Sequence, residues 1–295
     1  MDSTRLCVII PTFGRPAVLE TMLSHLEHQH RLPDHVVVSA PDATHLLDQR
    51  PRNYPISFVL GGMGISSQRN LGLEAATPNS DIITFFDDDF FPANNYLSQV
   101  EGCFAAHDDI AVVMGHAVVD GARGSGLTCE EGLQILRAAE ASAPAGEGFE
   151  DQPGAYGCNM SIRTDRIGDI RFDERLVLYG WQEDIDFTGQ LRRHGRVTKM
   201  MSLFGVHLGY KSGRISGVKL GYSQVVNPAY LIIKGTIPPR FALNLVARNI
   251  CANLLRSFWS EPYVDRIGRL KGNMIATWHL LQGRVEPEYV LKLLP

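Results

Sequence analysis

Short apolar runs alternate with longer amphipathic stretches along roughly the first 115 residues of the chain. Each apolar run ends at Pro, Ser, Gly or Asp, and runs of this kind predict buried strands. They fall at residues 6–10, 36–38, 56–60, 81–86 and 110–114. The stretches between them have helical spacing, with helices expected at residues 16–30, 66–76 and 93–107. This alternation predicts an α/β fold with a mostly parallel central sheet flanked by helices.

The pattern changes at residues 120–155, which are rich in Gly, Ala, Ser, Pro and Glu. We interpret them as a flexible excursion, either an active-site loop or a surface insertion. Regular patterning then returns, with elements expected at residues 156–163, 183–194 and 197–206. From residue 227 onward the pattern is helical. We therefore expect an α/β domain at residues 1–226 and a C-terminal helical appendage at residues 227–295.

Ligands of such sheets bind beyond the carboxyl ends of the strands. Four of the expected strands end in loops that could contact a ligand. These loops hold Pro11 and Thr12, residues 39–42, residues 61–64, and the triplet Asp87-Asp88-Asp89. Because parallel strands end at one edge, we expect all four loops to lie together.

The acidic triplet has a pair of phenylalanines on each side. Three adjacent carboxylates repel one another, so either water or a cation must hold them. Mg²⁺ and Mn²⁺ accept carboxylate oxygens and bridge to phosphates. In an extended chain Asp87 and Asp89 would point the same way, which makes them the expected pair of ligands. A solvated acidic turn is the alternative, and the apolar neighbours favour the cation site.

With Pro92 behind it, the triplet resembles the DXD region of family 2 glycosyltransferases. Residues 8–16 are similar to the first strand and nucleotide loop of that family, and residues 68–73 resemble its Arg-Asn-x-Gly segment. The resemblance covers about residues 5–210, and the order and spacing of the motifs make it specific. It implies the GT-A fold, a Rossmann-like sheet that binds a nucleotide-sugar donor.

A second acidic segment contains Trp181, Glu183 and Asp184. Carboxylates are favoured at a helix N-terminus, so helix capping is one explanation. The segment also resembles the Glu-Asp acceptor motif of the same family, including its galactosyltransferase-like branch with Gly-Trp. That resemblance implies that Asp184 is the catalytic base and that Glu183 shapes the acceptor site. Trp181 would then stack on a sugar face.

An inverting transfer needs a base for the acceptor hydroxyl and positive charge on the departing diphosphate. Mn²⁺ or Mg²⁺ would supply that charge, with Asp89 and Asp87 as ligands. His207 follows an expected strand and is either a third metal ligand, as the fold often has, or a structural histidine.

The donor is expected to be a UDP, GDP or dTDP sugar. Many family members carry an acidic pair after the second strand, whereas this chain has Ser39-Ala40-Pro41-Asp42, which leaves the nucleobase open. Lys211, Gly213 and Arg214 form a glycine-containing stretch that could close over phosphates. The residues expected to bind the donor are Pro11, Thr12, Arg15, Asp42, Arg69, Asp87 and Asp88.

Composition narrows the class of protein. The hydrophobic fraction of 44% and the charged fraction of 20% are typical of globular domains. A net charge of −4 gives no support to nucleic-acid binding. The five cysteines form no CxxC pair, which favours reduced thiols and a cytoplasmic location. We see no signal-peptide pattern and no apolar run near the roughly 20 residues that span a bilayer.

Residues 240–284 carry seven Arg or Lys against two acids, interspersed with bulky apolar side chains. A basic amphipathic stretch is typical of peripheral contact with a membrane, here the inner face of the cytoplasmic membrane. The alternative is a helical appendage that packs on the core, and an oligomer is compatible with either.

The leading hypothesis is an inverting glycosyltransferase that moves a hexose-type sugar to a saccharide or lipid-linked acceptor, in cell-surface polysaccharide synthesis by family resemblance. A non-catalytic GT-A assembly or scaffold protein is an alternative. A sugar-nucleotide pyrophosphorylase is less favoured. It would need a Gly-rich basic loop after the first strand, and residues 11–16 hold one Gly and two Pro.

Overall fold

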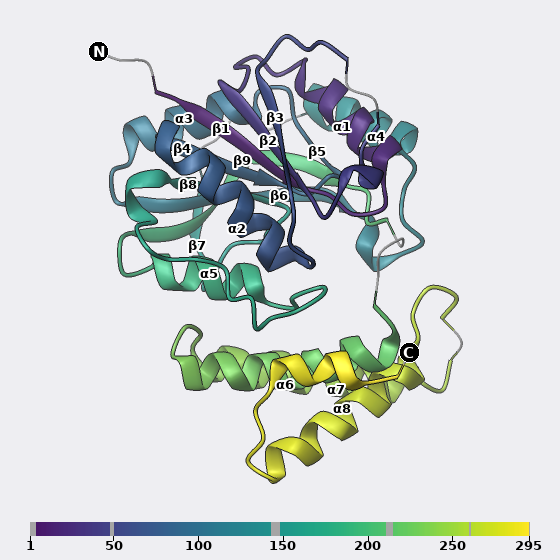
Figure 1. Ribbon diagram of the computed structural model, residues 1–295. Coiled ribbons are helices and arrows are strands. Elements are labelled where there is room, and N and C mark those ends of the chain that lie inside the picture. The colour runs from purple at the N-terminus through teal and green to yellow at the C-terminus, as the bar shows by residue number, and fades with distance from the viewer. Residues whose placement is uncertain (1–3, 48–49, 143–147, 211–214, 260, 295) are drawn as a thin grey trace.

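A computed structural model describes residues 4–47, 50–142, 148–210, 215–259 and 261–294. A nine-stranded sheet forms the centre of this part of the chain (Figure 1). Its order is β3 (Ile56–Leu60), β2 (His35–Ala40), β1 (Leu6–Pro11), β4 (Ile82–Phe86), β8 (Asn159–Arg163), β6 (Ile110–Asp120), β9 (Arg196–His207) and β5 (Phe90–Pro92), while β7 (Phe149–Asp151) pairs with β9. Strands β3, β2, β1 and β4 are parallel, and β8 joins β4 antiparallel.

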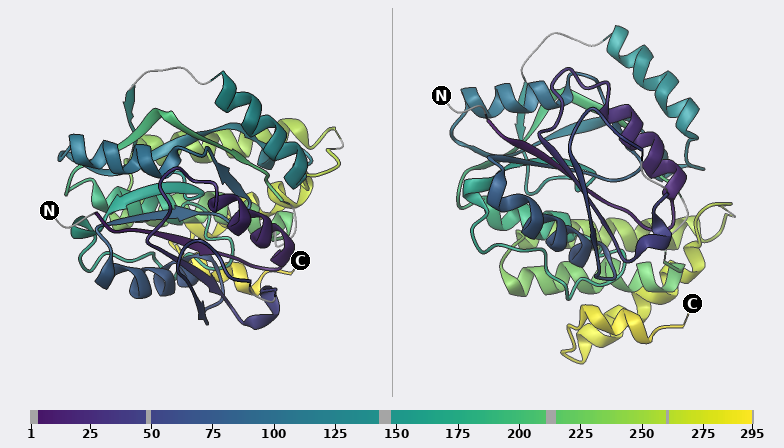
Figure 2. Two further views of the ribbon diagram at one scale, coloured as in Figure 1. Left: turned by 90° about the horizontal axis from the view of Figure 1, so that it is seen from above. Right: turned by 45° about the horizontal axis from the view of Figure 1, so that its top comes forward.

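Helices cover both faces of this sheet (Figure 2). One face packs against α1 (Pro16–Leu26), α3 (Tyr96–Ala106) and α4 (Cys129–Ala141), and the other against α2 (Ile65–Ala76) and α5 (Glu183–Leu191). Strand β1 shows why the sheet has an apolar surface on both faces. Val8 belongs to the first core cluster and Ile9 to the second, because successive side chains of a strand point to opposite faces. The predicted α/β class is confirmed.

The segment between β6 and β8 differs from the prediction for residues 120–155. Strand β6 extends to Asp120, and residues 129–141 form helix α4 rather than a flexible excursion. Thr128 and Glu131 build a capping box at the start of α4, and Leu136 is buried against the sheet. The Gly, Ala and Glu content concealed this local signal. Short 3-10 helices connect other elements, at Ala43–His45, Thr77–Asn79, Gly121–Arg123 and Thr164–Arg166.

The C-terminal part is helical, as predicted. It consists of α6 (Gly217–Lys234), α7 (Pro239–Arg256), α8 (Arg266–Leu281) and a 3-10 segment at Pro287–Lys292. The predicted domain boundary, between residues 226 and 227, lies inside helix α6. The division of the chain into two domains stays a prediction. No helix in the described part of the chain combines the length and apolar character needed to cross a bilayer.

Helices α6 and α8 cross at very short range because both carry glycine at the crossing. A Cβ atom at Gly272 would lie 2.1 Å from the carbonyl oxygen of Val218 and 2.6 Å from the amide nitrogen of Tyr222. Both of those atoms are backbone, which cannot move aside as a side chain does. The side chains of Tyr222, Val225 and Ala276 fill the resulting interface.

Replacing Gly272 by Ala is expected to lower the free energy of unfolding by about 1–3 kcal/mol, because the added methyl forces α6 and α8 apart. Chemical denaturation measures the change. The matched control is Gly102→Ala in α3, where a Cβ meets nothing within 4 Å. That change should be neutral or stabilise by about 0.5–1 kcal/mol. Equal stability of the two variants would contradict this account of the crossing.

Candidate functional site

The parallel strands bring the predicted loops to one edge of the sheet. The register pairs Pro11 with Ser39 and Ala40 with Leu60, so β1, β2 and β3 end level with one another. The amide of Thr12 continues the ladder, donating to the carbonyl of Ser39 at 2.9 Å. The expectation of neighbouring strand-end loops is therefore confirmed for the first three strands, and β4 adds the acidic triplet beside β1.

The triplet forms a tight turn between β4 and β5. The amide of Phe90 donates to the carbonyl of Asp87 at 3.0 Å, which folds the middle residue, Asp88, inward. The carboxylate of Asp88 is fully buried, accepts a 2.6 Å hydrogen bond from Thr12 Oγ1 and pairs with Arg15 at 2.5 Å. Burial raises the pKa of Asp88 to about 7, although the guanidinium of Arg15 acts in the opposite direction.

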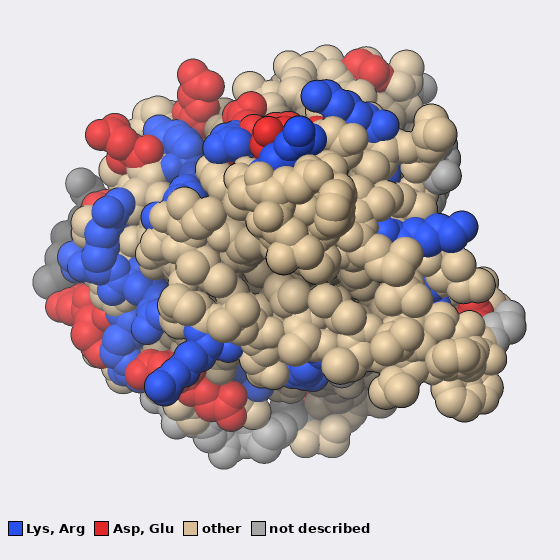
Figure 3. All heavy atoms as spheres, turned by 90° about the horizontal axis from the view of Figure 1, so that it is seen from below, with Lys and Arg blue, Asp and Glu red and all other residues tan. Residues whose placement is uncertain are grey.

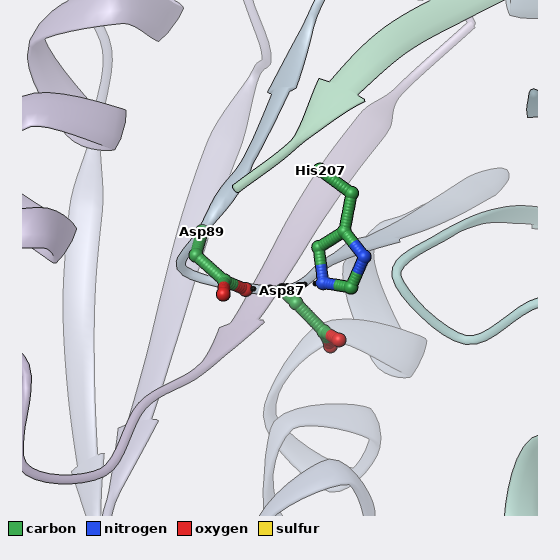
Figure 4. Close-up of side chains that lie close together, drawn as sticks. All are labelled: Asp87, Asp89 and His207. Atoms are coloured by element: carbon green, nitrogen blue, oxygen red, sulfur yellow. Dashed lines mark ion pairs between the residues drawn. The ribbon is translucent and has the colours of Figure 1, made fainter. Parts of the chain in front are cut away.

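The carboxylate of Asp89 points toward His207, and the carboxylate of Asp87 lies next to the imidazole ring (Figure 4). One ligand atom from each of Asp87, Asp89 and His207 lies within 4.8 Å of the others. Pairing of β5 with β9 sets Phe90 opposite His207, and this brings the histidine beside the turn. The His207 Nε2 atom lies 3.5 Å from Asp89 Oδ1. The sequence-predicted ligand pair and the predicted histidine therefore come together.

The charges of this cluster are strongly coupled. Burial acts against protonation of His207, but hydrogen bonds to Asp120 and Asp89 raise its pKa to about 10. Burial would likewise raise the pKa of Asp89, yet the hydrogen bond and charge of His207, with help from Arg15, hold it well below its usual value. The acids of this cluster outnumber its cations. The triplet and Asp120 together face three cations, which are Arg15, Arg69 and His207.

A second layer orients His207 through its other ring nitrogen. Nδ1 lies 2.9 Å from Asp120 Oδ1 and 3.3 Å from the hydroxyl of Tyr156. Proteins commonly orient a metal-binding histidine by such a carboxylate partner. Two carboxylates and one imidazole suit Mn²⁺ or Mg²⁺, so the residues present fit a divalent cation. Asp120 and Tyr156 were not predicted, because no local motif in the sequence marks them.

Arg69 is buried between the two acidic segments, although it was predicted as a donor contact. Its Nη2 atom lies 2.9 Å from Asp87 Oδ1, and its Nη1 atom lies 2.5 Å from Glu183 Oε1. Nη2 also donates to the carbonyl of Gly157 at 3.0 Å. A Cβ at Gly157 would lie 2.6 Å from both terminal nitrogens, so only glycine leaves room for the guanidinium. The rings of Phe85 and Phe172 lie 5.9 and 5.5 Å from it.

Asp184 follows Glu183 at the start of α5. Its Oδ2 atom accepts a 2.8 Å hydrogen bond from the amide of Gly157, and Oδ1 accepts one of 2.8 Å from the amide of Ile185. Burial raises the pKa of Asp184, and the nearby charge of Arg69 opposes this. Capping explains the Ile185 contact but not Glu183, whose side chain is bound to Arg69 instead.

Trp181 lies just ahead of this helix. Its carbonyl accepts a 2.9 Å hydrogen bond from Asn227 Nδ2 of α6, and its ring stacks on Tyr179 with centroids 6.3 Å apart. Asp42 lies at the other end of the site, where it is exposed and caps a 3-10 turn through the amide of Thr44 at 2.8 Å. The predicted phosphate contacts Lys211, Gly213 and Arg214 lie outside the described residues.

Replacing Arg69 by Met is expected to lower the free energy of unfolding by about 3–5 kcal/mol, because Glu183 and Asp87 lose their buried cation. Chemical denaturation measures the change. The control is Arg175→Met, which removes a surface ion pair with Glu288 and should cost about 1 kcal/mol or less. Similar losses in both variants would refute the central position of Arg69.

Comparisons with known proteins agree with this geometry. Residues 7–142 match the profile of Glycosyl transferase family 2. No curated protein sequence matches the chain. The crystal structure of S. aureus TarS 1-349 in complex with UDP is similar at a TM-score of 0.53 and 17% identity, over 86% of this chain and 73% of that chain. Its complex with UDP-GlcNAc gives 0.50 and 16%, over 95% and 93%.

The mannosyltransferase PcManGT from Pyrobaculum calidifontis, in complex with GDP-Man and Mn²⁺, is similar at a TM-score of 0.51 and 18% identity. That match covers 98% of this chain and 86% of that chain. The chain spans 40% of the length of a longer S. aureus TarS chain that it also matches, at a TM-score of 0.46 and 18% identity, over 76% of its own length. At these identities the structures show a shared fold. The fold is α/β of the GT-A type, and residues 7–142, a little under half of the chain, are similar to glycosyl transferase family 2.

Proposed function

We propose that this protein is a metal-dependent inverting glycosyltransferase. It moves a hexose-type sugar from a nucleotide donor to a saccharide or lipid-linked acceptor, in cell-surface polysaccharide synthesis. The observation that carries the proposal is the double contact of Arg69 with Asp87 and Glu183. This contact holds the strand-end acidic turn and the start of α5 against each other. A donor at the turn would therefore lie beside the carboxylate of Asp184.

The donor side is supported by the shape of the strand-end loops. Thr12 and Arg15 both contact the buried Asp88, so the loop after β1 is tied to the acidic turn. Next to that loop, the ring of Phe13 lies 4.7 Å from His45, close to Asp42. An aromatic surface and an exposed carboxylate suit the base and ribose of a nucleotide. Two similar structures hold UDP or GDP sugars, which keeps both nucleotide classes open for this chain.

The residues that would hold Mn²⁺ or Mg²⁺ are Asp87, Asp89 and His207. When bound, the metal supplies positive charge to the departing diphosphate. The protein contributes the geometry of the ligands. The turn between β4 and β5 fixes the two carboxylates, and Asp120 orients the imidazole from behind. PcManGT, with the same fold, was solved with Mn²⁺.

Asp184 is the proposed base. It would take the proton of the acceptor hydroxyl while that oxygen attacks the anomeric carbon and the bond to the diphosphate breaks. Burial raises its pKa, which makes the ionised carboxylate a stronger proton acceptor. The amide hydrogen bond from Gly157 fixes the orientation of the carboxylate. Trp181 and Tyr179 would offer the acceptor a stacked aromatic surface next to this base.

Exchanging Asp184 for Asn should reduce transfer by about 10²–10⁴-fold, because the amide cannot accept the proton. Binding of UDP or GDP sugars, followed by calorimetry, should survive. The control is Asp165→Asn, whose carboxylate is largely exposed and away from the site, and which should transfer at the normal rate. Normal turnover by the Asp184 variant would refute its assignment as the base. Metal-loaded protein that neither transfers nor hydrolyses any donor would instead favour a non-catalytic assembly protein.

Metal binding can be tested without turnover, by titrating Mn²⁺ and following the free ion by electron paramagnetic resonance. Asp89→Asn should abolish the site. Asp120→Asn should weaken binding by about 10–100-fold, because His207 loses its orienting partner. Asp108→Asn, at a carboxylate that is almost fully exposed, is the control and should leave the affinity unchanged. Full affinity in the Asp120 variant would exclude His207 as an oriented ligand.

A further inference from the structure

Helices α7 and α8 each expose a row of large apolar side chains. The row on α7 and just beyond it contains Leu243, Leu254 and Phe258, and the row on α8 contains Ile267, Trp278 and Leu281. Between 47% and 78% of each of these side chains is exposed. Their spacings of three, four and eleven residues fit whole turns of a helix, so each row lies on one side of its helix. We call these six residues the apolar face.

The apolar face is separate from the sides of α7 and α8 that form the core of the helical unit. The opposite sides of α7 and α8 already pack inward, with Ala242 and Asn253 of α7 and Ala276 of α8 buried. Asn253 donates to both Gln224 of α6 and Asn273 of α8, which joins the three helices. Single exposed apolar residues are ordinary, but rows of large apolar side chains on two helices that pack together mark an interaction site.

The charge around the apolar face is positive. The same stretch carries Arg240, Arg248, Arg256, Arg269, Lys271 and Arg284. Its two acids are engaged locally. Glu261 pairs with Arg266 at 2.9 Å, and Asp265 caps α8 by accepting from the amide of Gly268 at 2.7 Å. Seen from below, this end of the molecule is a broad uncharged surface, with Lys and Arg along its border and some Asp and Glu among them (Figure 3).

We propose that the apolar face docks on an anionic lipid surface, with α7 and α8 lying in the plane of the interface. Helices that bind in this way bury an apolar side among the acyl chains while their basic side chains meet anionic headgroups. The basic border selects this occupant over a second copy of the chain. A symmetric dimer through the same face would bring the arginines of both copies together.

Docking would also set the orientation of the candidate site relative to the lipid surface. Helix α6 lies between the apolar face and the segment that contains Trp181 and Asp186. It holds this segment through the hydrogen bond of Asn227 to the carbonyl of Trp181 and through the ion pair of Lys234 with Asp186 at 2.6 Å. A docked protein would therefore present the segment that leads into α5 close to the lipid surface. If the proposed transferase activity holds, the acceptor class that this orientation favours is a lipid-linked saccharide. The docking itself does not depend on that activity.

The test is co-sedimentation of the full chain with vesicles of phosphatidylcholine alone or in equal parts with phosphatidylglycerol, at low salt. We expect binding to the anionic vesicles. Trp278→Gln and Leu281→Gln should each lower partition by about tenfold. Arg248→Gln and Lys271→Gln should each lower it about fivefold on anionic vesicles only. The control, Met201→Gln on β9, removes an exposed apolar side chain elsewhere and should bind normally.

Deleting α7 and α8 would be a poor test, because it would expose to solvent the side chains of α6 that these helices bury. Since substitutions can also unfold a protein, the unmodified chain gives a second measurement. Trp259 and Trp278 are 69% and 60% exposed, so brominated phosphatidylcholine in the anionic vesicles should quench their fluorescence. No binding, no quenching, undiminished binding by both α8 variants, or equal binding to neutral vesicles would overturn the proposal. So would a dimer that blocks vesicle binding.

Discussion

The buried guanidinium of Arg69 is the constraint on which the site depends. A cation with 2% exposure is stable only if acids surround it, and Asp87 and Glu183 provide them from segments far apart in the chain. Desolvation and ion pairing together leave little freedom for either partner. The strand-end turn and the start of α5 are therefore fixed relative to each other before any substrate binds. In the proposed transferase, that fixed relation would set the distance between the donor and the base.

The same balance of charge explains the rest of the cluster. Arg69 engages Asp87, Arg15 pairs with Asp88 and Asp89, and His207 lies between Asp89 and Asp120. Carboxylates still outnumber cations, and several of them are buried where water cannot screen their repulsion. A divalent cation offers the missing positive charge at the point where the ligand atoms of Asp87, Asp89 and His207 converge. The phosphates of a donor would then bind to a metal rather than to bare acids.

Local patterns in the sequence made much of the fold and part of the candidate site predictable. The buried strands have short apolar runs, and the acidic triplet directly follows one of them, so both the sheet edge and the place of Asp87 and Asp89 at that edge followed from the sequence. Long-range partners did not follow. Asp120 reaches His207 only because β6 and β9 pair in parallel along their full lengths, with irregular register. Arg69 looked like a free cation, since nothing in its own helix shows that acids of two distant segments enclose it.

In the C-terminal helices, a buried polar network fixes the position of α7 and α8 relative to the candidate site. Asn253 of α7 donates to Gln224 of α6 and to Asn273 of α8, and glycines let α6 and α8 approach to backbone contact. Such a unit behaves as one rigid body, because shifting any helix would leave buried amides unpaired. Lys234 and Asn227 then fasten α6 to the segment that leads into α5. Whatever holds the outer side of α7 and α8 therefore also orients Trp181 and Asp184.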